Sequence, residues 1–407
     1  MRSLIATAAL LAATSLSTAY ASDLRMSWWG SDDRHLATQE ALKLCGGKFG
    51  HTIAPEFTGW TGHQEKVTTQ LAGRTEADIM QINWPWLPIF SKSGDGFADL
   101  NQYKDIIDLS QWSDNDLNSG SVDGKLNGLP VSTTGRAGLA IPTTWDELIA
   151  AAPVMKEKLG QDYYPFEGAA LDARLVVILR TTQMTGKDLI DPTTHKVAWT
   201  PEELAEGLEF YQTMVDKGVI ESWKTVAAGG NAPLHENPEW AKGKIAGTYQ
   251  WDSTYGKISG PMEDGQTLVP VKLLTVEGAT TEGVYRKPSM LFAISKNSKD
   301  PKAAAQVINC MLNDPEAIKI LGATRGIPSS KIALEVLGKE GKIKPVQIEA
   351  NKIVLEASGV GVSPLNEHPR VTDVFDSTFE AFAYGQASAA DAAQEIIDGI
   401  NDALTGI

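Results

Sequence analysis

Cysteine is scarce in this sequence: Cys45 and Cys310 are the only two among 407 residues. Together with six scattered histidines, they show no metal-ligand spacing, so we predict neither a metal site nor a cofactor. In an oxidising compartment the two cysteines form one disulfide or remain two buried thiols. The geometry that separates these alternatives is not contained in a sequence, so both stay open.

Positive charge is also in short supply. The chain has 36 lysines and arginines against 51 aspartates and glutamates, which gives a net charge of −15 at pH 7. Nucleic-acid binding needs a cationic surface, so this balance argues against a nucleic-acid partner. The net charge says little about a small ligand, because exposed charges more than about 8–10 Å apart are screened at physiological salt.

Long hydrophobic runs are missing as well, since no stretch reaches about 18 uninterrupted apolar residues. The first 21 residues instead have the pattern of a secretory signal peptide. Arg2 supplies the positive charge, an apolar run begins at Ile5, and Ala19-Tyr20-Ala21 offers a cleavage site with small residues. We therefore expect an exported chain that begins near Ser22.

Tryptophan, in contrast, is plentiful where strands are expected to end. Expected strands at 24–27, 53–57 and 78–82 run into Trp28-Trp29, Trp60 and Trp84-Pro85-Trp86. Ligands of open α/β sheets bind beyond the carboxyl ends of the strands, where flat indole faces suit flat apolar ligand faces. Any single tryptophan is as easily core packing, but the threefold repetition favours a crevice that stacks a ligand. For the adjacent Trp28 and Trp29, we expect one ring to stack and the other to pack, because neighbours on a strand face opposite sides.

Alternating strand and helix signals predict an α/β fold, and the mature chain is long enough for two cores. A helix should start at Asp32-Asp33 and stop at Gly46-Gly47, and the tail from about 330 should be helical and pack mainly on the second lobe. The other main elements expected are helices at 146–159, 170–185 and 201–217 and strands at 243–250 and 290–294.

Several motifs bear on the family. They are the helix start Thr144-Trp145-Asp146-Glu147-Leu148, the turn Lys242-Gly243-Lys244-Ile245-Ala246-Gly247, and Arg325-Gly326-Ile327-Pro328. Together they resemble the extracellular solute-binding proteins of ABC transporters, specifically the carbohydrate-binding family related to maltose-binding protein. The resemblance implies a type II, two-lobed periplasmic binding-protein fold. Each lobe would be a mixed sheet flanked by helices, with the ligand cleft between the lobes. It also implies a monomer in the periplasm that delivers a small saccharide or sugar glycoside to a membrane permease.

The same resemblance divides the chain. The N-terminal lobe would comprise residues 22–128 and 289–325, and the C-terminal lobe residues 129–288 and 326–407. The crossover segments near 128–135 and 283–289 would act as hinges for lobe closure.

A closer likeness is to oligogalacturonide-binding members, in Trp28-Trp29-Gly30 with Arg34-His35, Thr58-Gly59-Trp60, Asn83-Trp84 and Trp251-Asp252-Ser253-Thr254. That branch also includes binders of other anionic sugars, among them sulfoquinovose glycosides. The likeness implies an anionic saccharide, with a neutral oligosaccharide as the main rival.

A site for such a ligand needs cations, aromatic platforms and hydroxyl-binding groups. The candidate cations are Arg34, His35, Arg136, Arg286 and Arg325. Arginine is favoured because its planar fork holds a carboxylate or sulfonate through two parallel bonds, although an ordinary salt bridge is the alternative for each. Arg34 and His35 also lie in the first turn of a helix, where anions are attracted. The candidate platforms are Trp29, Trp60, Trp84, Trp86 and Trp251, and the candidate polar contacts are Gly30, Thr58, Gln64, Asn83, Asp252 and Ser253.

The main alternative class is an exported glycoside-cleaving enzyme. Asp32, Asp33, Glu76 and Asp252 are available carboxylates, and catalysis would need two of them facing each other across the scissile bond. No nucleophile elbow, zincin helix or phosphate loop occurs, so we predict a binding protein rather than an enzyme. An adhesin is less favoured, because a scaffold has no need for aromatic side chains around a shared crevice.

One departure from the resembled family follows Arg136. Relatives continue with a strand and a short helix, whereas here Arg136 runs almost directly into Ala137-Gly138-Leu139 and Pro142. The loss of a strand would leave its neighbours in the sheet unpaired. We therefore expect this chain to be less stable than its relatives or to bind poorly.

Overall fold

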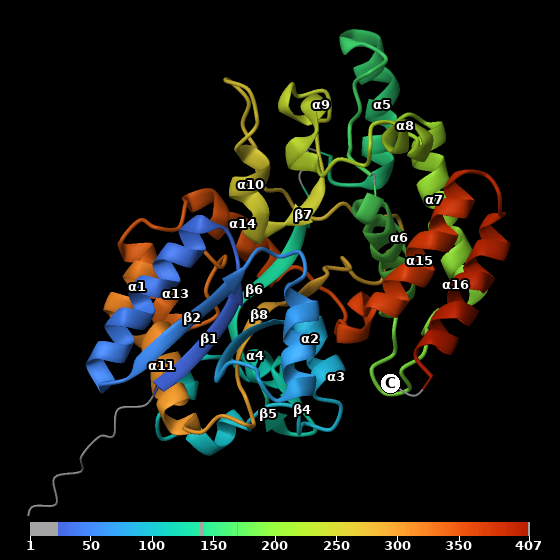
Figure 1. The fold of residues 1–407 in the computed structure, drawn as a ribbon. Helices are drawn as coiled ribbons and strands as arrows, with labels where there is room; N and C mark the ends of the chain where they lie inside the picture. The colour runs from blue at the N-terminus through green and yellow to red at the C-terminus, as the bar shows by residue number, and fades with distance from the viewer. Residues whose placement is uncertain (1–22, 139–141, 169, 406–407) are drawn as a thin grey trace, which may run out of the picture.

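The computed structural model describes residues 23–138, 142–168 and 170–405, and the expected signal peptide lies outside them. Two lobes stand side by side, joined by strands that run from one into the other (Figure 1). The main sheet has six strands in the order β2-β1-β3-β8-β6-β7. Within the described ranges, every helix is too short or too polar to span a bilayer.

The strands are β1 (Asp23–Trp29), β2 (Thr52–Thr58), β3 (Ile79–Asn83), β4 (Ser121–Val122), β5 (Lys125–Leu126), β6 (Leu129–Gly138), β7 (Tyr249–Trp251) and β8 (Arg286–Ile294). β1 lies between β2 and β3 and is parallel to both, so the carboxyl ends of these three strands meet at one edge. β8 is antiparallel to β3 and to β6.

The helices of the first lobe are α1 (Asp32–Phe49), α2 (His63–Gly73), α3 (Leu87–Phe90), α4 (Asp114–Ser119), α11 (Pro301–Asn313), α12 (Pro315–Leu321) and α13 (Lys331–Lys339). The others are α5 (Trp145–Leu159), α6 (Ala170–Thr185), α7 (Pro201–Asp216), α8 (Trp223–Ala228), α9 (Pro238–Ala241), α10 (Tyr255–Ser259), α14 (Pro345–Glu356), α15 (Pro369–Ala383) and α16 (Ala389–Ala403). Short 3-10 turns include η1 (Trp84–Trp86), η5 (Asp252–Thr254) and η6 (Pro364–Glu367).

Two helices begin at side-chain caps. Thr144 and Glu147 form the capping box that starts α5, because each side chain bonds the other residue's backbone N–H. Asp300 caps α11 by accepting a hydrogen bond from the backbone N–H of Ala303. Caps of this kind depend on residues three apart, so they can be predicted locally.

Two separate hydrophobic cores underlie the two lobes. The first packs β1, β3 and β8 against α1 and α11, with Trp28, Ile79 and Phe292 at its centre. The second is formed mainly by helices α5, α6, α7, α15 and α16, with Trp145 and Phe375 fully buried. Strands contribute little to the second core, since among the described residues only the end of β6, the start of β8 and the three residues of β7 extend into that lobe.

β6 and β8 connect the lobes. Leu129 of β6 lies opposite Phe292 in the first lobe, and Gly135 lies opposite Arg286 nearer the second. The register shifts between Pro130 and Thr133, which marks a β-bulge and a local bend. Residues 129–135 and 286–289 of the expected hinge segments therefore lie in strands that are paired with each other.

The expected stop of the first helix at Gly46-Gly47 is wrong. α1 continues to Phe49 and ends at Gly50, whose φ of 75° is left-handed. Gly46 serves a different purpose, because a Cβ there would lie 2.5 Å from the carbonyl oxygen of His51 and 2.7 Å from the Ile53 side chain. The glycine allows the helix to approach β2 closely. In the sequence, a glycine that permits close packing looks the same as a glycine that ends a helix.

The strand expected over residues 243–250 is much shorter than predicted. Regular pairing covers only β7, where Gln250 lies opposite Ala137. Residues 244–247 make only an isolated bridge to the segment around Tyr164, in which Tyr164 N–H donates to the Lys244 carbonyl and Glu167 N–H donates to that of Gly247. Isolated bonds on one side do not make a regular ladder.

The tail is helical as expected, but its first helix packs elsewhere. α15 and α16 belong to the second core. α13 instead places Ala333 and Leu337 against Ile318 of α12, beside the first lobe. The shared apolar face of α12 and α13 keeps the chain at the first lobe up to Ile343, beyond the boundary expected at Arg325.

The shortened segment after Arg136 falls largely outside the described residues, which resume at Pro142. β6 itself extends to Gly138 and pairs with both β7 and β8. The effect of the shortening on stability stays a prediction.

Cys45 of α1 and Cys310 of α11 form a disulfide, which settles the alternative that the sequence left open. Their Cα atoms are 5.8 Å apart and the bond closes a loop of 265 residues. Both side chains are buried in the first core. The bond therefore ties the helix that follows β1 to the helix that follows β8.

We predict that replacing both cysteines (Cys45→Ala and Cys310→Ala) lowers the free energy of unfolding by about 2–4 kcal/mol, because the unfolded chain gains freedom. Urea unfolding without reductant measures the change. With reductant in the urea, wild type and variant should unfold at the same midpoint, which is the control. Equal midpoints without reductant would contradict a stabilising role.

Candidate functional site

A cavity of about 530 Å³ opens between the lobes, beyond the carboxyl ends of β1 and β3. This volume is within the range of small-molecule sites, about 300–1,000 Å³. Its walls come from both lobes and from β8, which passes between them. The residues that line it are Trp29, Gly30, Arg34, Trp60, Asn83, Trp251, Ser253, Thr254, Lys257, Lys287, Ser289, Met290, Ala323, Thr324, Arg325 and Gly326.

The first-lobe wall is aromatic. Trp28 is fully buried whereas its neighbour Trp29 lines the cavity, because neighbours on a strand face opposite sides. Stacking of Trp29 on a ligand stays a prediction. The Trp60 side chain is 55% exposed and its ring centroid lies 5.3 Å from that of Trp29. A large ring left in solvent beside a cavity is available for stacking.

Trp86 and His63 support this wall from behind. The Trp86 ring stacks with Trp60 at 5.7 Å and contacts Trp29 at 5.3 Å. His63 is fully buried against Trp29, and its Nδ1 lies 2.6 Å from the Thr58 hydroxyl. Burial lowers the pKa of His63 to about 4, so its imidazole is neutral at pH 7.

The opposite wall carries Trp251, Ser253 and Lys257 on the segment from β7 to α10. Lys287 of β8 lies beneath the Trp251 ring, with its ammonium 4.9 Å from the ring centroid. The same ammonium forms a 2.5 Å ion pair with Glu367 of η6. Lys287 is thus a cation that already has its counterion.

Arg34 has no such counterion among the described residues. Its guanidinium donates to the Thr324 carbonyl from Nε at 3.0 Å and from Nη2 at 2.8 Å, and Nη1 donates to the Trp29 carbonyl at 3.2 Å. Gly30 is required for this arrangement, because a Cβ there would lie 2.6 Å from the Arg34 side chain. Burial lowers the pKa of Arg34 to about 10, which still leaves it charged at pH 7.

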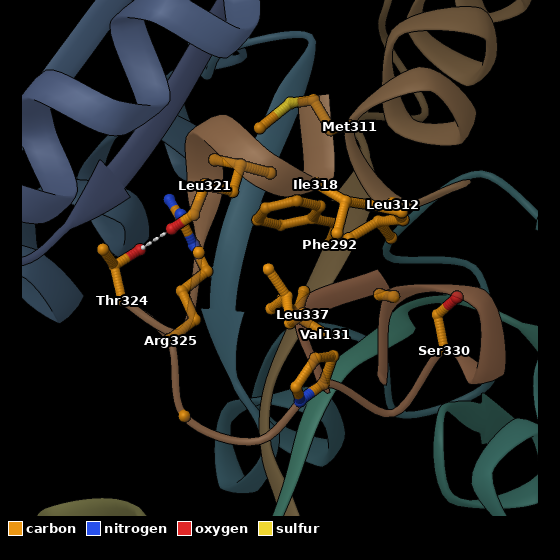
Figure 2. Close-up of a pocket in the computed structure, with 14 residues that line it drawn as sticks. Val131, Phe292, Met311, Leu312, Ile318, Leu321, Thr324, Arg325, Ser330 and Leu337 are labelled. Carbon is orange, nitrogen blue, oxygen red and sulfur yellow. Dashed lines mark hydrogen bonds between the residues drawn. The ribbon is translucent and has the colours of Figure 1, made fainter. Parts of the chain in front are cut away.

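Arg325 lies deeper, at the border between this cavity and a small apolar one of about 40 Å³ (Figure 2). Its guanidinium donates to Gln81 Oε1 and to the Thr38 hydroxyl, both at 2.8 Å, and lies 5.4 Å from the Phe292 ring. Its Nη1 is buried without a hydrogen-bond partner. Burial and then the charge of Arg34 lower the pKa of Arg325 well below its ordinary value.

The charges around the cavity are therefore unbalanced. Four of the described lining residues are basic, namely Arg34, Lys257, Lys287 and Arg325, and none is acidic. Glu367 neutralises only Lys287. Arg325 is buried without a counterion, which costs free energy, and an anion placed in the cavity would offset that cost.

Eight of the residues predicted from the sequence line the cavity: Trp29, Gly30, Arg34, Asn83, Trp60, Trp251, Ser253 and Arg325. The remaining eight do not belong to its described lining. For most of these, the structure shows another partner that accounts for the side chain.

On the first lobe, the Trp84 indole donates to the Ser119 carbonyl at 2.8 Å and lines a different cavity. His35 accepts a hydrogen bond from the Trp28 indole at 3.1 Å and stacks on Phe57. Thr58 pairs with His63, Trp86 packs behind the aromatic wall, and Gln64 lies half-buried on α2.

On the other side, Asp252 is buried and accepts hydrogen bonds from the Ser253 backbone and the Asn351 amide. Arg286 donates to the Val354 and Leu355 carbonyls at the end of α14. Arg136 is placed by its backbone opposite Trp251, and its side chain lies outside the described part of the structure.

Sequence reasoning missed several lining residues. Thr324 precedes the predicted Arg325, and Lys287 belongs to the crossover that was expected to be a hinge, so neighbouring signals existed for both. Lys257 lies on α10, a short helix with no pattern that relates it to a site. Its position is decided by the turn after β7.

The comparison with known proteins identifies the family. The model for bacterial extracellular solute-binding proteins matches residues 40–346. The chain belongs to this family. Two solved structures of solute-binding proteins confirm the two-lobed α/β fold that was expected.

The first is a periplasmic solute-binding protein from Pectobacterium atrosepticum, 36% identical with a TM-score of 0.88, over 94% of this chain and 99% of that one. The second is a periplasmic oligogalacturonide-binding protein from Yersinia enterocolitica, in complex with saturated digalacturonic acid. It is 37% identical with a TM-score of 0.85, over 94% of this chain and 99% of that one.

A diacetylchitobiose-binding protein from Streptomyces coelicolor is 24% identical over 306 residues, which are 68% of this chain and 66% of that protein. The matched regions cover only 44% to 66% of the length of these curated relatives.

We predict that His63 makes this solute-binding protein less stable in mild acid. The unfolded chain binds a proton near pH 6.5 and the folded chain only near pH 4, so stability falls as the pH drops between these values. The contribution approaches about 1.4 kcal/mol per pH unit.

Unfolding free energies measured from pH 7 to pH 4 test this prediction in a His63→Asn variant, whose slope should be shallower than that of wild type. His195→Asn is the matched control, because His195 is exposed and should leave the slope unchanged. A slope for His63→Asn equal to that of wild type would refute the role of His63.

Proposed function

We propose that this solute-binding protein captures an anionic saccharide, or an anionic sugar glycoside, in the cavity between its lobes and delivers it to an ABC-transporter permease. The ligand would be of the oligogalacturonide or the sulfoquinovose-glycoside type. The protein would act in the periplasm as a monomer, after export directed by residues 1–21.

The observation that carries this proposal is the charge of the cavity. Arg34 and Arg325 have only neutral hydrogen-bond acceptors, and no carboxylate belongs to the described lining. A carboxylate or sulfonate of the ligand would supply the missing countercharge, with Arg34 as its nearest contact. A neutral sugar would leave the guanidinium groups uncompensated.

The walls suit a sugar ring. Trp60 and Trp29 on one side and Trp251 on the other offer flat faces for apolar sugar C–H groups. Asn83, Ser253 and Thr324 offer hydroxyl-binding groups between them. The similarity to the oligogalacturonide-binding protein of Yersinia enterocolitica supports an acidic sugar, whereas the weaker similarity to a diacetylchitobiose-binding protein supports the neutral alternative.

Hydrolysis of a glycoside is not favoured by this arrangement. It requires two carboxyl groups facing each other across the bond, and the described lining contains none. Of the four candidates, Glu76 is buried and bonded to Ser295 and Asn297, and Asp252 is buried beside Asn351. Asp32 and Asp33 are exposed on the first turn of α1.

Ligand capture would work through closure of the lobes. A ligand that touches Arg34 on one side and Trp251 on the other has more contacts in the closed state, and this difference in affinity shifts the equilibrium towards closure. Gly326 borders the other lobe, because a Cβ there would lie 3.1 Å from Ser253. The paired segments of β6 and β8 would bend at the irregularity in their register.

We predict that Arg34→Met weakens the binding of digalacturonate by at least about 10-fold, because charge-assisted hydrogen bonds contribute about 1.5–3 kcal/mol. The binding of diacetylchitobiose should change much less. Isothermal titration calorimetry at low and moderate salt measures both, and salt should weaken only the anionic ligand.

Two further variants act as controls for this prediction. Arg74→Met removes the same charge from an exposed position outside the cavity and should leave both affinities unchanged. Trp60→Ala removes a stacking face and should weaken both ligands together. If wild type binds the neutral disaccharide more tightly than any anionic saccharide, the anionic proposal fails.

We also predict that saturating digalacturonate reduces the radius of gyration of the wild-type protein in X-ray scattering, because the lobes close. The Arg34→Met variant under the same ligand concentration should stay closer to the unliganded value. Identical scattering profiles for wild type with and without bound ligand would rule out hinge closure.

A further inference from the structure

The surroundings of Arg325 are unusual for a buried arginine. Its side chain is 5% exposed, yet every acceptor that it reaches is neutral. Gln81 and Thr38 supply these acceptors, and both are completely buried. Figure 2 shows the side chain rising beside Thr324, at the edge of an apolar cavity that contains Phe292 and Leu321.

The two neutral partners are themselves held in place by the site. The Gln81 amide donates to the Trp29 carbonyl at 3.3 Å, which is the same carbonyl that receives Nη1 of Arg34. The Thr38 hydroxyl donates to the Arg34 carbonyl at 2.6 Å. One network therefore joins both guanidinium groups and the Trp29 carbonyl without a carboxylate.

A carboxylate is the usual partner of a buried arginine, since it satisfies both charge and hydrogen bonds. Glutamate is almost the same size and shape as glutamine, and aspartate is close in size to threonine. Size alone thus gives no reason for the neutral residues at positions 81 and 38. The two choices differ in charge and in hydrogen bonding: a carboxylate would neutralise Arg325, but it could not donate the hydrogen bonds that Gln81 and Thr38 make to the Trp29 and Arg34 carbonyls.

We propose that Gln81 and Thr38 are positioning residues that hold Arg325 in place without neutralising it, so that the acid group of the ligand supplies the countercharge. This inference rests on the proposed function, and it assigns the affinity for anions to two residues that do not touch the ligand. Arg325 acts from behind Arg34: it raises the positive potential of the cavity while Arg34 makes the contact. The protein therefore gives up stability in the unliganded state.

The decisive variant is Gln81→Glu, which places a carboxylate on Nε of Arg325. Two opposite effects are expected. The midpoint of thermal unfolding should rise by about 2 °C, because the counterion gained by a buried cation outweighs the hydrogen bond that position 81 no longer donates to the Trp29 carbonyl. The affinity for digalacturonate should fall at least about 10-fold, because the protein now supplies the charge that the ligand would bring.

Gln183→Glu is the matched control. Gln183 is also completely buried, but its amide donates to the Leu274 and Glu282 carbonyls in the second lobe, and no cation is bonded to it. The same substitution there should lower the unfolding midpoint and leave the affinity of the folded protein unchanged. Thr38→Asp is a second way to neutralise Arg325, and it should also reduce the affinity for digalacturonate. It serves as the test if Gln81→Glu does not fold.

The outcomes separate this inference from the proposed function. A stabilised Gln81→Glu variant with weakened anion binding supports it, and a purely structural role cannot change the two quantities in opposite directions. Unchanged anion affinity in both Gln81→Glu and Thr38→Asp, with wild type binding digalacturonate, overturns the inference alone. If wild type binds no anionic saccharide, the proposed function fails. In that case the unfolding midpoint of Gln81→Glu still tests whether Arg325 lacks a counterion. If this midpoint falls as far as that of Gln183→Glu, the inference about Arg325 is overturned as well.

Discussion

The antiparallel pairing of β6 with β8 is the constraint on which the rest of the structure depends. These two strands belong to the first core at Leu129 and Phe292 and reach the second lobe at Arg136 and Arg286. Along β8, Lys287, Ser289 and Met290 line the interlobe cavity, whereas Arg286 and Pro288 line a separate one, which Lys287 also borders. A change in the pairing would move both walls of the cavity at once, so a bend in these strands is the natural way to open and close it.

Next to these two strands lie Arg34 and Arg325, two cations for which the described residues supply no counterion. The disulfide between Cys45 and Cys310 anchors α1, whose first turn carries Arg34, to α11. Thr324 and Arg325 follow α12, which packs on α1, so both guanidinium groups lie where these helices meet. Electrostatic preorganisation of this kind favours an anion, because the cations do not have to be gathered when the ligand arrives.

Part of each lobe was predictable because its signals are local. In the second lobe, the capping box at Thr144 depends on residues three positions apart. In the first lobe, the strands that lead to Trp29 and Asn83 were expected, although β1 includes Trp28 and Trp29 instead of ending before them. The same pattern over-predicted Trp84 and Trp86, which follow a strand but turn away into η1 and pack against Ser119 and His63. A tryptophan after a strand looks the same in sequence whether the next turn points it into a cavity or into the core.

By itself, the sequence determined the α/β class and the rim of strand ends at which aromatic side chains gather, because hydrophobic period and cap chemistry act over short distances. Only the tertiary structure decided which residues share the cavity. Arg34 is 290 positions from Thr324, and Gln81 is 244 positions from Arg325. These residues meet because α1, β3 and the loop after α12 pack together. The absence of a carboxylate among them is a property of that packing, since acidic residues are abundant in the chain as a whole.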